Sequence, residues 1–269
     1  MIEKEYNKNM KTIILLHGAW VTPKSWDPFK SYFEAKGYRV LAPAWPGKEH
    51  TVEEQQKNPD PSLAKLGLKE IVDYYAKIIE AEPEPPILIG HSFGGLFVEM
   101  LLDRGLGKAG IAIDPAPPKG VFALYPTAAW ALRLPLTTAF GWKKIIRWPL
   151  HHFAYAFTNT LSPEEQEKAY REYVVPESGR IFWQAAFAPF NNVLNVNFQN
   201  PNRAPLLIIA GEKDHIVPAA INRANFKKYQ ASSAKTDFKE FPGRTHWIIA
   251  EPGWEEVAKS CENWIRVNA

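Results

Sequence analysis

The sequence predicts an α/β protein in which a mostly parallel central sheet is flanked by helices and carries a helical lid. Short apolar runs alternate with amphipathic stretches along most of the 269 residues, as strands and crossover helices do. Between residues 115 and 201 this alternation stops, and the segment holds 16 of the 35 aromatic residues. We therefore assign residues 1–114 and 202–269 to the core, and residues 115–201 to a helical cap or lid.

Six short, largely apolar runs are expected to be the strands of the sheet. In chain order they cover residues 12–18, 38–47, 85–90, 108–118, 204–214 and 236–246. Near-continuous apolar character, without strict alternation of polar residues, is typical of parallel strands that helices cover on both faces. We expect these runs to form a sheet buried within the chain.

Amphipathic stretches between the runs are expected to be the covering helices. Residues 25–37 place Phe29, Tyr32 and Phe33 on one apolar face, and Gly37 ends the pattern. The other core helices are expected at 66–82, 93–105 and from about Trp254 onwards.

The lid segment is expected to hold several short helices. One begins at the sequence "SPEE", where Ser162 supplies an N-cap, Pro163 occupies the first helical position and Glu165 the third.

Composition excludes several classes of protein. The single cysteine, Cys261, cannot form an intramolecular disulfide and fits a reducing compartment. Residues 1–18 lack the apolar core of a signal peptide, so we expect a cytoplasmic protein. No apolar run reaches the ~20 residues that span a bilayer, so no membrane span is expected. A net charge of +3 is too small to indicate a nucleic-acid partner.

The stretch "GHSFGG" (90–95) joins an expected strand directly to an expected helix. A serine in so tight a turn projects its hydroxyl above the sheet, and the residues two before and two after it must be small. Gly90 and Gly94 meet that requirement around Ser92. The start of the following helix supplies unpaired N–H groups suited to a developing negative charge. Ser92 is therefore the candidate nucleophile, with Gly90 and Gly94 as the glycines of the turn.

A serine nucleophile needs a base, and the base needs an acid that orients it. Asp214 follows the run "LLIIAGEKD", and His246 follows the run "FKEFPGRTH". The order Ser, Asp, His is the one expected for a serine presented on such a strand–helix turn. Asp114, in "GIAIDPAP", also leaves a strand end and is the alternative acid. We expect Asp214 to be the acid and His246 the base.

With these residues in view, the chain resembles the serine hydrolases of the α/β-hydrolase fold, in their esterase and hydroxynitrile-lyase-like branch. The resemblance covers nearly the whole chain. "HGAW" (17–20) is similar to the oxyanion loop of that branch, which implies that the backbone N–H groups of Ala19 and Phe93 form the oxyanion hole. One departure is Thr245, which precedes His246 where many relatives carry glycine.

The expected function is hydrolysis of carboxylic esters through an acyl-enzyme, on a small, apolar substrate. Two alternatives remain: hydrolysis of a lactone, amide or C–C bond, or cyanohydrin cleavage, by the same triad, and ligand binding without turnover, as in receptor-like members of the fold. No cofactor is expected, because "GHSFGG" lacks the Gly-x-Gly-x-x-Gly spacing of dinucleotide sites. No metal is expected, because His151 and His152 have no carboxylate or cysteine at ligand spacing.

Overall fold

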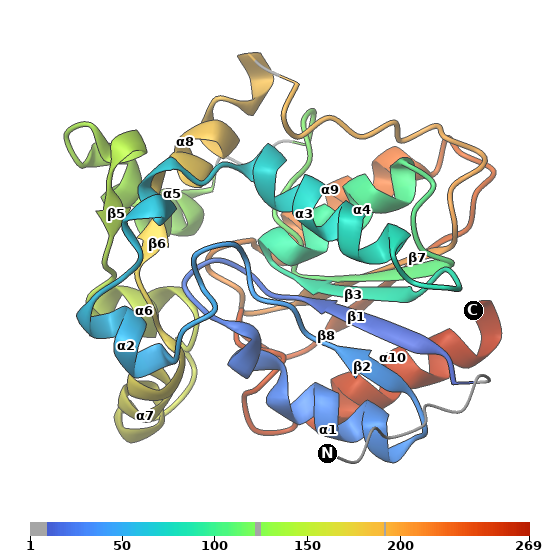
Figure 1. Ribbon diagram of the computed structural model, residues 1–269, viewed down its shortest axis with the longest axis horizontal. Coiled ribbons are helices and arrows are strands. Elements are labelled where there is room, and N and C mark those ends of the chain that lie inside the picture. The colour runs from blue at the N-terminus through green and yellow to red at the C-terminus, as the bar shows by residue number, and fades with distance from the viewer. Residues whose placement is uncertain (1–9, 122–124, 191) are drawn as a thin grey trace.

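A six-stranded sheet forms the centre of the molecule in the computed structural model (Figure 1). Its strands are β1 (Thr12–Leu16), β2 (Arg39–Leu41), β3 (Ile87–His91), β4 (Ala109–Ile113), β7 (Leu206–Gly211) and β8 (Thr236–Phe241). Their order is β2-β1-β3-β4-β7-β8, and every pairing between them is parallel. Each of the six predicted runs supplies one strand, so the predicted parallel sheet of an α/β fold is confirmed.

The structure describes residues 10–121, 125–190 and 192–269. Residues 1–9 carry much of the sequence on which the expectation of no signal peptide rests, and they lie outside the described ranges. Within those ranges, no helix combines the length and the apolar composition that crossing a bilayer requires.

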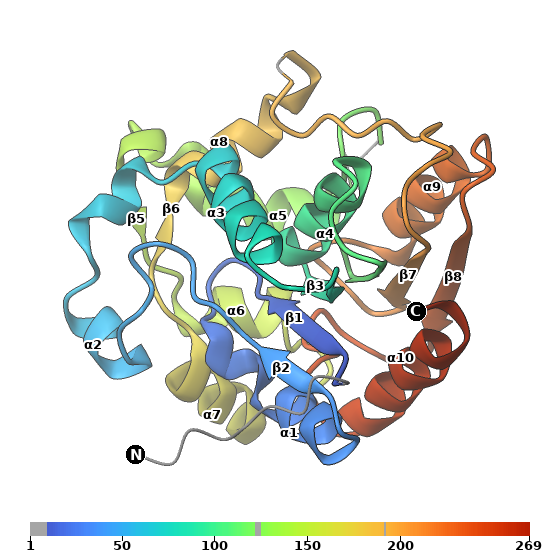
Figure 2. The ribbon, with the colours of Figure 1, turned by 45° about the vertical axis from the view of Figure 1, so that its right-hand side comes forward.

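Helices cover both faces of the sheet (Figures 1 and 2). On one face lie α3 (Leu68–Glu80), α4 (Phe93–Asp103) and α9 (Ala219–Tyr229). On the other face lie α1 (Asp27–Ala35) and α10 (Trp254–Asn268). A short 3₁₀ turn, η1 (Pro23–Trp26), precedes α1, and both α2 (Val52–Lys57) and a second such turn, η2 (Pro61–Lys65), lie between β2 and α3. The helices α2 and α9 were not predicted.

The two-sided burial of the strands explains their apolar sequences. On β1, Ile14 and Leu16 pack in the hydrophobic cluster that includes α3 and α4. Ile13 and Leu15 point the other way, into the cluster that includes α1 and α10. Because successive side chains of a strand face opposite sides, a strand buried on both sides needs apolar residues throughout.

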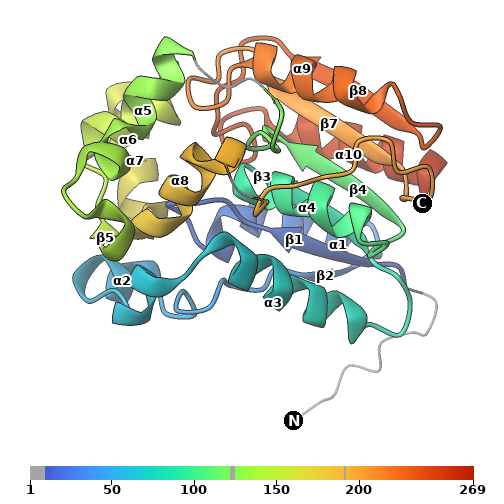
Figure 3. The same ribbon diagram turned by 90° about the horizontal axis from the view of Figure 1, so that it is seen from above.

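The helices and short strands of the inserted segment (residues 115–201), between residues 126 and 190, gather beside the carboxyl ends of the strands (Figure 3), whereas residues 197–200 bind Asp103 at the end of α4. The segment holds α5 (Pro126–Thr137), η3 (Gly141–Lys143), β5 (Ile145–Ile146), α6 (Leu150–Ala156), α7 (Pro163–Tyr173), β6 (Glu177–Ser178), α8 (Gly179–Ala186) and η4 (Ala188–Phe190). The predicted helix start at Ser162 is confirmed, because Ser162 and Glu165 form a reciprocal capping box. The antiparallel pair β5–β6 was not predicted. Its second strand leads directly into α8 and contributes to the site described next.

Candidate active site

The turn between β3 and α4 places Ser92 in a strained conformation. Its φ of 57° and ψ of −121° lie in a region that a residue with a side chain rarely adopts. The turn is held by hydrogen bonds from Ser92 N to Ile113 O (2.9 Å) and from Ala116 N to Ser92 O (3.0 Å). The neighbouring strand end therefore fixes the position of the serine.

The two glycines around Ser92 are required by space. A Cβ atom on Gly90 would lie 2.0 Å from the carbonyl oxygen of Gly94, where β3 and α4 cross. A Cβ atom on Gly94 would lie 2.0 Å from the carbonyl oxygen of Leu16 on β1. Both contacts are with backbone, which cannot move aside as a flexible side chain can. The structure thus places the two glycines where the sequence analysis expected close approach of strand and helix.

The loop after β1 lies directly against the serine. A Cβ atom on Gly18 would come within 2.8 Å of Ser92 Cβ. His17 anchors this loop, since its Nδ1 hydrogen-bonds to Gly18 O (2.8 Å) and its Nε2 accepts from Trp45 N (3.2 Å). Burial, followed by the nearby charge of Lys48, lowers the pKa of His17 well below its usual value, so its ring is neutral. A neutral ring is what donating at one nitrogen and accepting at the other requires.

Two backbone N–H groups near Ser92 are without partners that would compete for them. Within the described residues, the N–H of Ala19 has no hydrogen-bond acceptor. Phe93 is the first residue of α4, and the first N–H groups of a helix have no acceptor within the helix. These are the two groups that the resemblance implied for an oxyanion hole.

His246 and Asp214 form a buried pair at the ends of the last two strands. Nδ1 of His246 lies 2.5 Å from Oδ2 of Asp214, and both side chains are fully buried. The other carboxylate oxygen of Asp214 accepts from the backbone N–H groups of Ile216 (2.7 Å) and Val217 (2.9 Å). Asp214 therefore holds the imidazole with Nδ1 as the donor, which leaves Nε2 as an acceptor. Nε2 has no hydrogen-bond partner among the described residues.

The structure brings His246 close to the serine turn without joining it to Ser92. The ring of His246 lies 4.6 Å from the ring of His91, the residue before Ser92, measured between centroids. His91 Nε2 also donates to His246 O (2.8 Å). Since Nε2 of His246 is unpartnered, no hydrogen bond links it to Ser92 Oγ. Such bonds are often long in the absence of substrate and tighten when it binds.

Thr245 fastens the loop that carries His246. Its hydroxyl donates to Glu251 Oε2 (2.5 Å) and accepts from Trp247 N (3.1 Å). Its backbone N–H donates to the same carboxylate, at 3.1 Å from Oε1. The hydroxyl of Thr245 therefore makes two contacts that a glycine at this position, which has no side chain, could not make.

Asp114, the alternative acid, has a different set of contacts. Its Oδ1 accepts from Gly211 N (2.7 Å) at the end of β7, and its Oδ2 has no partner among the described residues. Burial, followed by the charge of Asp214, raises the pKa of Asp114 well above its usual value. Its surroundings therefore favour the neutral carboxyl group, and its bond to Gly211 ties the end of β4 to the loop leading to Asp214.

His91, Asp114 and His246 bring nitrogen and carboxylate oxygen atoms within 4.8 Å of one another. The sequence did not reveal this cluster, because each residue follows or ends a different strand. His91 Nε2 is engaged by a carbonyl group and His246 Nδ1 by Asp214. The absence of a metal stays a prediction.

Aromatic side chains of the inserted segment cover the serine turn and the loop beside it. Trp148 stacks on Trp20 at 4.3 Å between centroids, and Phe182 of α8 lies 5.0 Å from Trp20 and 5.7 Å from Phe93. Phe157 packs edge-on against His246 at 4.7 Å. The surroundings of the candidate site are therefore largely apolar.

Two charged residues that the sequence analysis did not single out are buried beside the same loop. Lys48 follows β2, and Glu177 lies on β6 of the inserted segment; the two form an ion pair with fully buried side chains. The only sequence feature that could have drawn attention to them is that each lies in a stretch with Pro and Gly, "PAWPGKE" (43–49) and "VVPESG" (174–179). Nothing in the sequence indicated that the two stretches meet.

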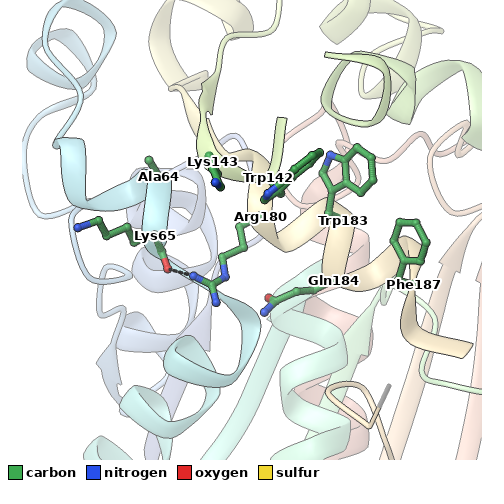
Figure 4. A pocket seen from close by; sticks show the side chains of 8 residues that line it. All are labelled: Ala64, Lys65, Trp142, Lys143, Arg180, Trp183, Gln184 and Phe187. Carbon is green, nitrogen blue, oxygen red and sulfur yellow. Dashed lines mark hydrogen bonds between the residues drawn. The ribbon is translucent and has the colours of Figure 1, made fainter. Parts of the chain in front are cut away.

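A cavity of about 680 Å³ lies between η2 and the inserted segment (Figure 4). It is lined by Ala64, Lys65, Trp142, Lys143, Arg180, Trp183, Gln184 and Phe187. None of the predicted site residues lines it. Phe182 and Trp183 are adjacent on α8, yet Phe182 packs on Trp20 while Trp183 faces this cavity.

The chain matches the model of the family described as the alpha/beta hydrolase family over residues 13–259. Among solved structures, it is similar to a monoacylglycerol lipase of Paleococcus ferrophilus, with a TM-score of 0.67 and 22% identity over 96% of this chain and 95% of that one. It is also similar to polyneuridine aldehyde esterase, with a TM-score of 0.64 and 17% identity over 94% and 98% of the two chains. A pyrethroid hydrolase from Sphingobium faniae has a TM-score of 0.64 and 18% identity over 95% and 97%. No curated protein matches the chain. At these identities the likeness to solved structures establishes the fold alone.

Replacing Gly94 with alanine is expected to destabilise the protein by at least about 3 kcal/mol, because the new Cβ would overlap the carbonyl group of Leu16. Gly105→Ala is the matched control. Gly105 has a φ of +78° but open space around it, so alanine there is expected to cost about 1 kcal/mol of backbone strain. Urea unfolding measures both losses, and equal losses would contradict the proposed close crossing.

Proposed function

The chain belongs to the alpha/beta hydrolase family, and from this premise we propose that it is a serine hydrolase that cleaves carboxylic esters through an acyl-enzyme. The substrate class we propose is a small, apolar ester, bound beneath residues 115–201 acting as a cap. Ser92 would be the nucleophile, His246 the base and Asp214 the acid that orients it.

One observation carries the proposal more than any other: the buried pair of His246 and Asp214. The bond from Nδ1 to Asp214 selects the tautomer whose Nε2 can accept a proton. That nitrogen has no other partner among the described residues, and its ring packs against the residue before Ser92. His91 also has one unpartnered ring nitrogen, but its other nitrogen binds a backbone carbonyl group, whereas only His246 is bound by a carboxylate group.

The reaction follows from these positions. Ser92 Oγ would attack the ester carbonyl carbon while His246 Nε2 takes the hydroxyl proton. The N–H groups of Ala19 and Phe93 would stabilise the negative oxygen of the tetrahedral intermediate. His246 would then pass the proton to the leaving alcohol, and a water molecule activated by the same nitrogen would release the acid.

The apolar character of the proposed substrate rests on the aromatic residues around the site. Trp20, Phe93, Trp148 and Phe182 pack on one another above the serine turn. Groups of this kind favour binding of apolar acyl or alcohol parts and exclude water from the reacting carbonyl.

A fluorophosphonate probe is expected to add one phosphonyl group to the wild-type protein and none to Ser92→Ala, as measured by intact mass. With p-nitrophenyl esters of increasing acyl length, the substitution is expected to lower kcat by at least about 10³-fold. A folded wild-type protein that is neither labelled nor active would favour ligand binding without turnover. Faster turnover of a matched lactone than of any ester would move the proposal to the lactonase alternative.

The same substitution at the two candidate acids separates their roles. Asp214→Asn is expected to lower kcat by about 10⁴-fold, because the amide stabilises the wrong tautomer of His246. Asp114→Asn is expected to lower kcat by less than about tenfold, because a neutral amide oxygen can still accept from Gly211 N. Steady-state kinetics on one ester measures both effects. The reverse order would assign the acid to Asp114.

A further inference from the structure

The buried ion pair of Lys48 and Glu177 lies against the loop that carries Ala19. Both side chains have no exposed surface. Besides its partner, Lys48 Nζ donates to Val21 O (3.1 Å) and lies 4.9 Å from the centre of the Trp45 ring. Lys48 thus holds the backbone carbonyl group of Val21, the residue that follows the loop of residues 17–20.

Glu177 holds the loop from the other side. Its Oε2 accepts from Trp20 N (3.1 Å) as well as from Lys48, and its Oε1 accepts from Ser178 N (2.8 Å). Trp20 has a φ of 68°, a left-handed conformation that is unfavourable for a residue with a bulky side chain. The hydrogen bond to the buried carboxylate, together with the stacking of Trp148 on the indole, keeps Trp20 in this conformation.

These contacts leave one N–H of the loop available. Val175 N donates to Trp20 O (2.8 Å), so both backbone groups of Trp20 are bound to the inserted segment. Gly18 O is bound by His17. The free N–H of Ala19 lies in the same peptide group as Gly18 O, so the bond from His17 holds that group directly. Trp20 N belongs to the next peptide group, and its bond to Glu177 holds the other side of Ala19. The two bonds together restrict the direction in which the N–H of Ala19 points.

The ion pair has an electrostatic consequence as well. A buried carboxylate beside Trp20 would repel a negative oxygen forming at Ala19, one residue away, in surroundings of low dielectric constant. Lys48 cancels that charge. Since a buried ion pair is rarely more stabilising than apolar residues of similar size, stability alone does not account for its presence.

We propose that Lys48 and Glu177 are positioning residues for the oxyanion hole: Glu177 orients the Ala19–Trp20 peptide from the inserted segment, and Lys48 neutralises Glu177 and fixes Val21. This inference rests on the proposed function. It also makes the inserted segment part of the catalytic apparatus, because β6 supplies Glu177.

Three variants test the inference: Lys48→Met, Glu177→Gln and the double variant. Glu177→Gln keeps an acceptor for Trp20 N, whereas Lys48→Met leaves an uncompensated buried carboxylate. We therefore expect kcat for a p-nitrophenyl ester to fall at least about tenfold in Lys48→Met, and less in Glu177→Gln. In each variant KM is expected to stay within about twofold of the wild type, because the oxyanion exists only in the transition state. The double variant is expected to regain part of the loss in Lys48→Met and to remain at least about threefold below the wild type in kcat.

Inhibitors separate positioning from general damage. A trifluoromethyl ketone, which forms an oxyanion on the serine, is expected to bind Lys48→Met more weakly in proportion to the loss of kcat. A non-reactive alcohol of the same chain length is expected to bind it as it binds the wild type. The matched control is Glu99→Gln, the same substitution at a fully buried carboxylate that accepts from Asn225 and Tyr229 on α9. It is expected to leave kcat unchanged.

The outcomes are decisive for the inference. A folded Lys48→Met variant with kcat within twofold of the wild type, or with equal losses of affinity for both inhibitors, would overturn it. Should Lys48→Met fail to fold, the double variant decides, and a kcat there within twofold of the wild type overturns the inference. A wild-type protein that neither hydrolyses esters nor reacts at Ser92 would instead overturn the proposed function.

Discussion

The crossing of β3 and α4 at Ser92 is the constraint on which the candidate site depends. Backbone meets backbone there, so that a single methyl group on Gly90 or Gly94 would lie 2.0 Å from a carbonyl oxygen. The crossing forces Ser92 into a conformation with positive φ. It also places the start of α4, with its free N–H groups, directly after the serine. The parallel sheet supplies the rest, because the carboxyl ends of its strands meet at one edge, where Asp214 and His246 leave β7 and β8.

The inserted segment is built into this edge and does more than cover it. Its residues bind both backbone groups of Trp20, and its aromatic rings pack on Trp20, Phe93 and His246. A substitution in β6 or α8 is therefore expected to reach the site through the loop after β1.

The sequence predicted the sheet, four core helices and the grouping of Ser92, Asp214 and His246 at one sheet edge, because local patterns carry that information. Two-sided apolar runs mark the strands, and paired glycines mark the crossing. Helix α9 was missed because its buried face includes Asn222 and Asn225, which obscure the apolar period. The pairing of Lys48 with Glu177 was beyond local patterns, since it joins residues that are 129 positions apart. Nor does any sequence pattern give the distance between Ser92 and His246.

A crystal structure of the phosphonylated protein tests the central claim most directly. The account predicts a phosphonyl group on Ser92 with one oxygen about 3 Å from the backbone nitrogens of both Ala19 and Phe93, and with His246 Nε2 within hydrogen-bonding distance of Ser92 Oγ. A phosphonyl oxygen turned away from both amides, or an imidazole that stays out of reach of the serine, would contradict it.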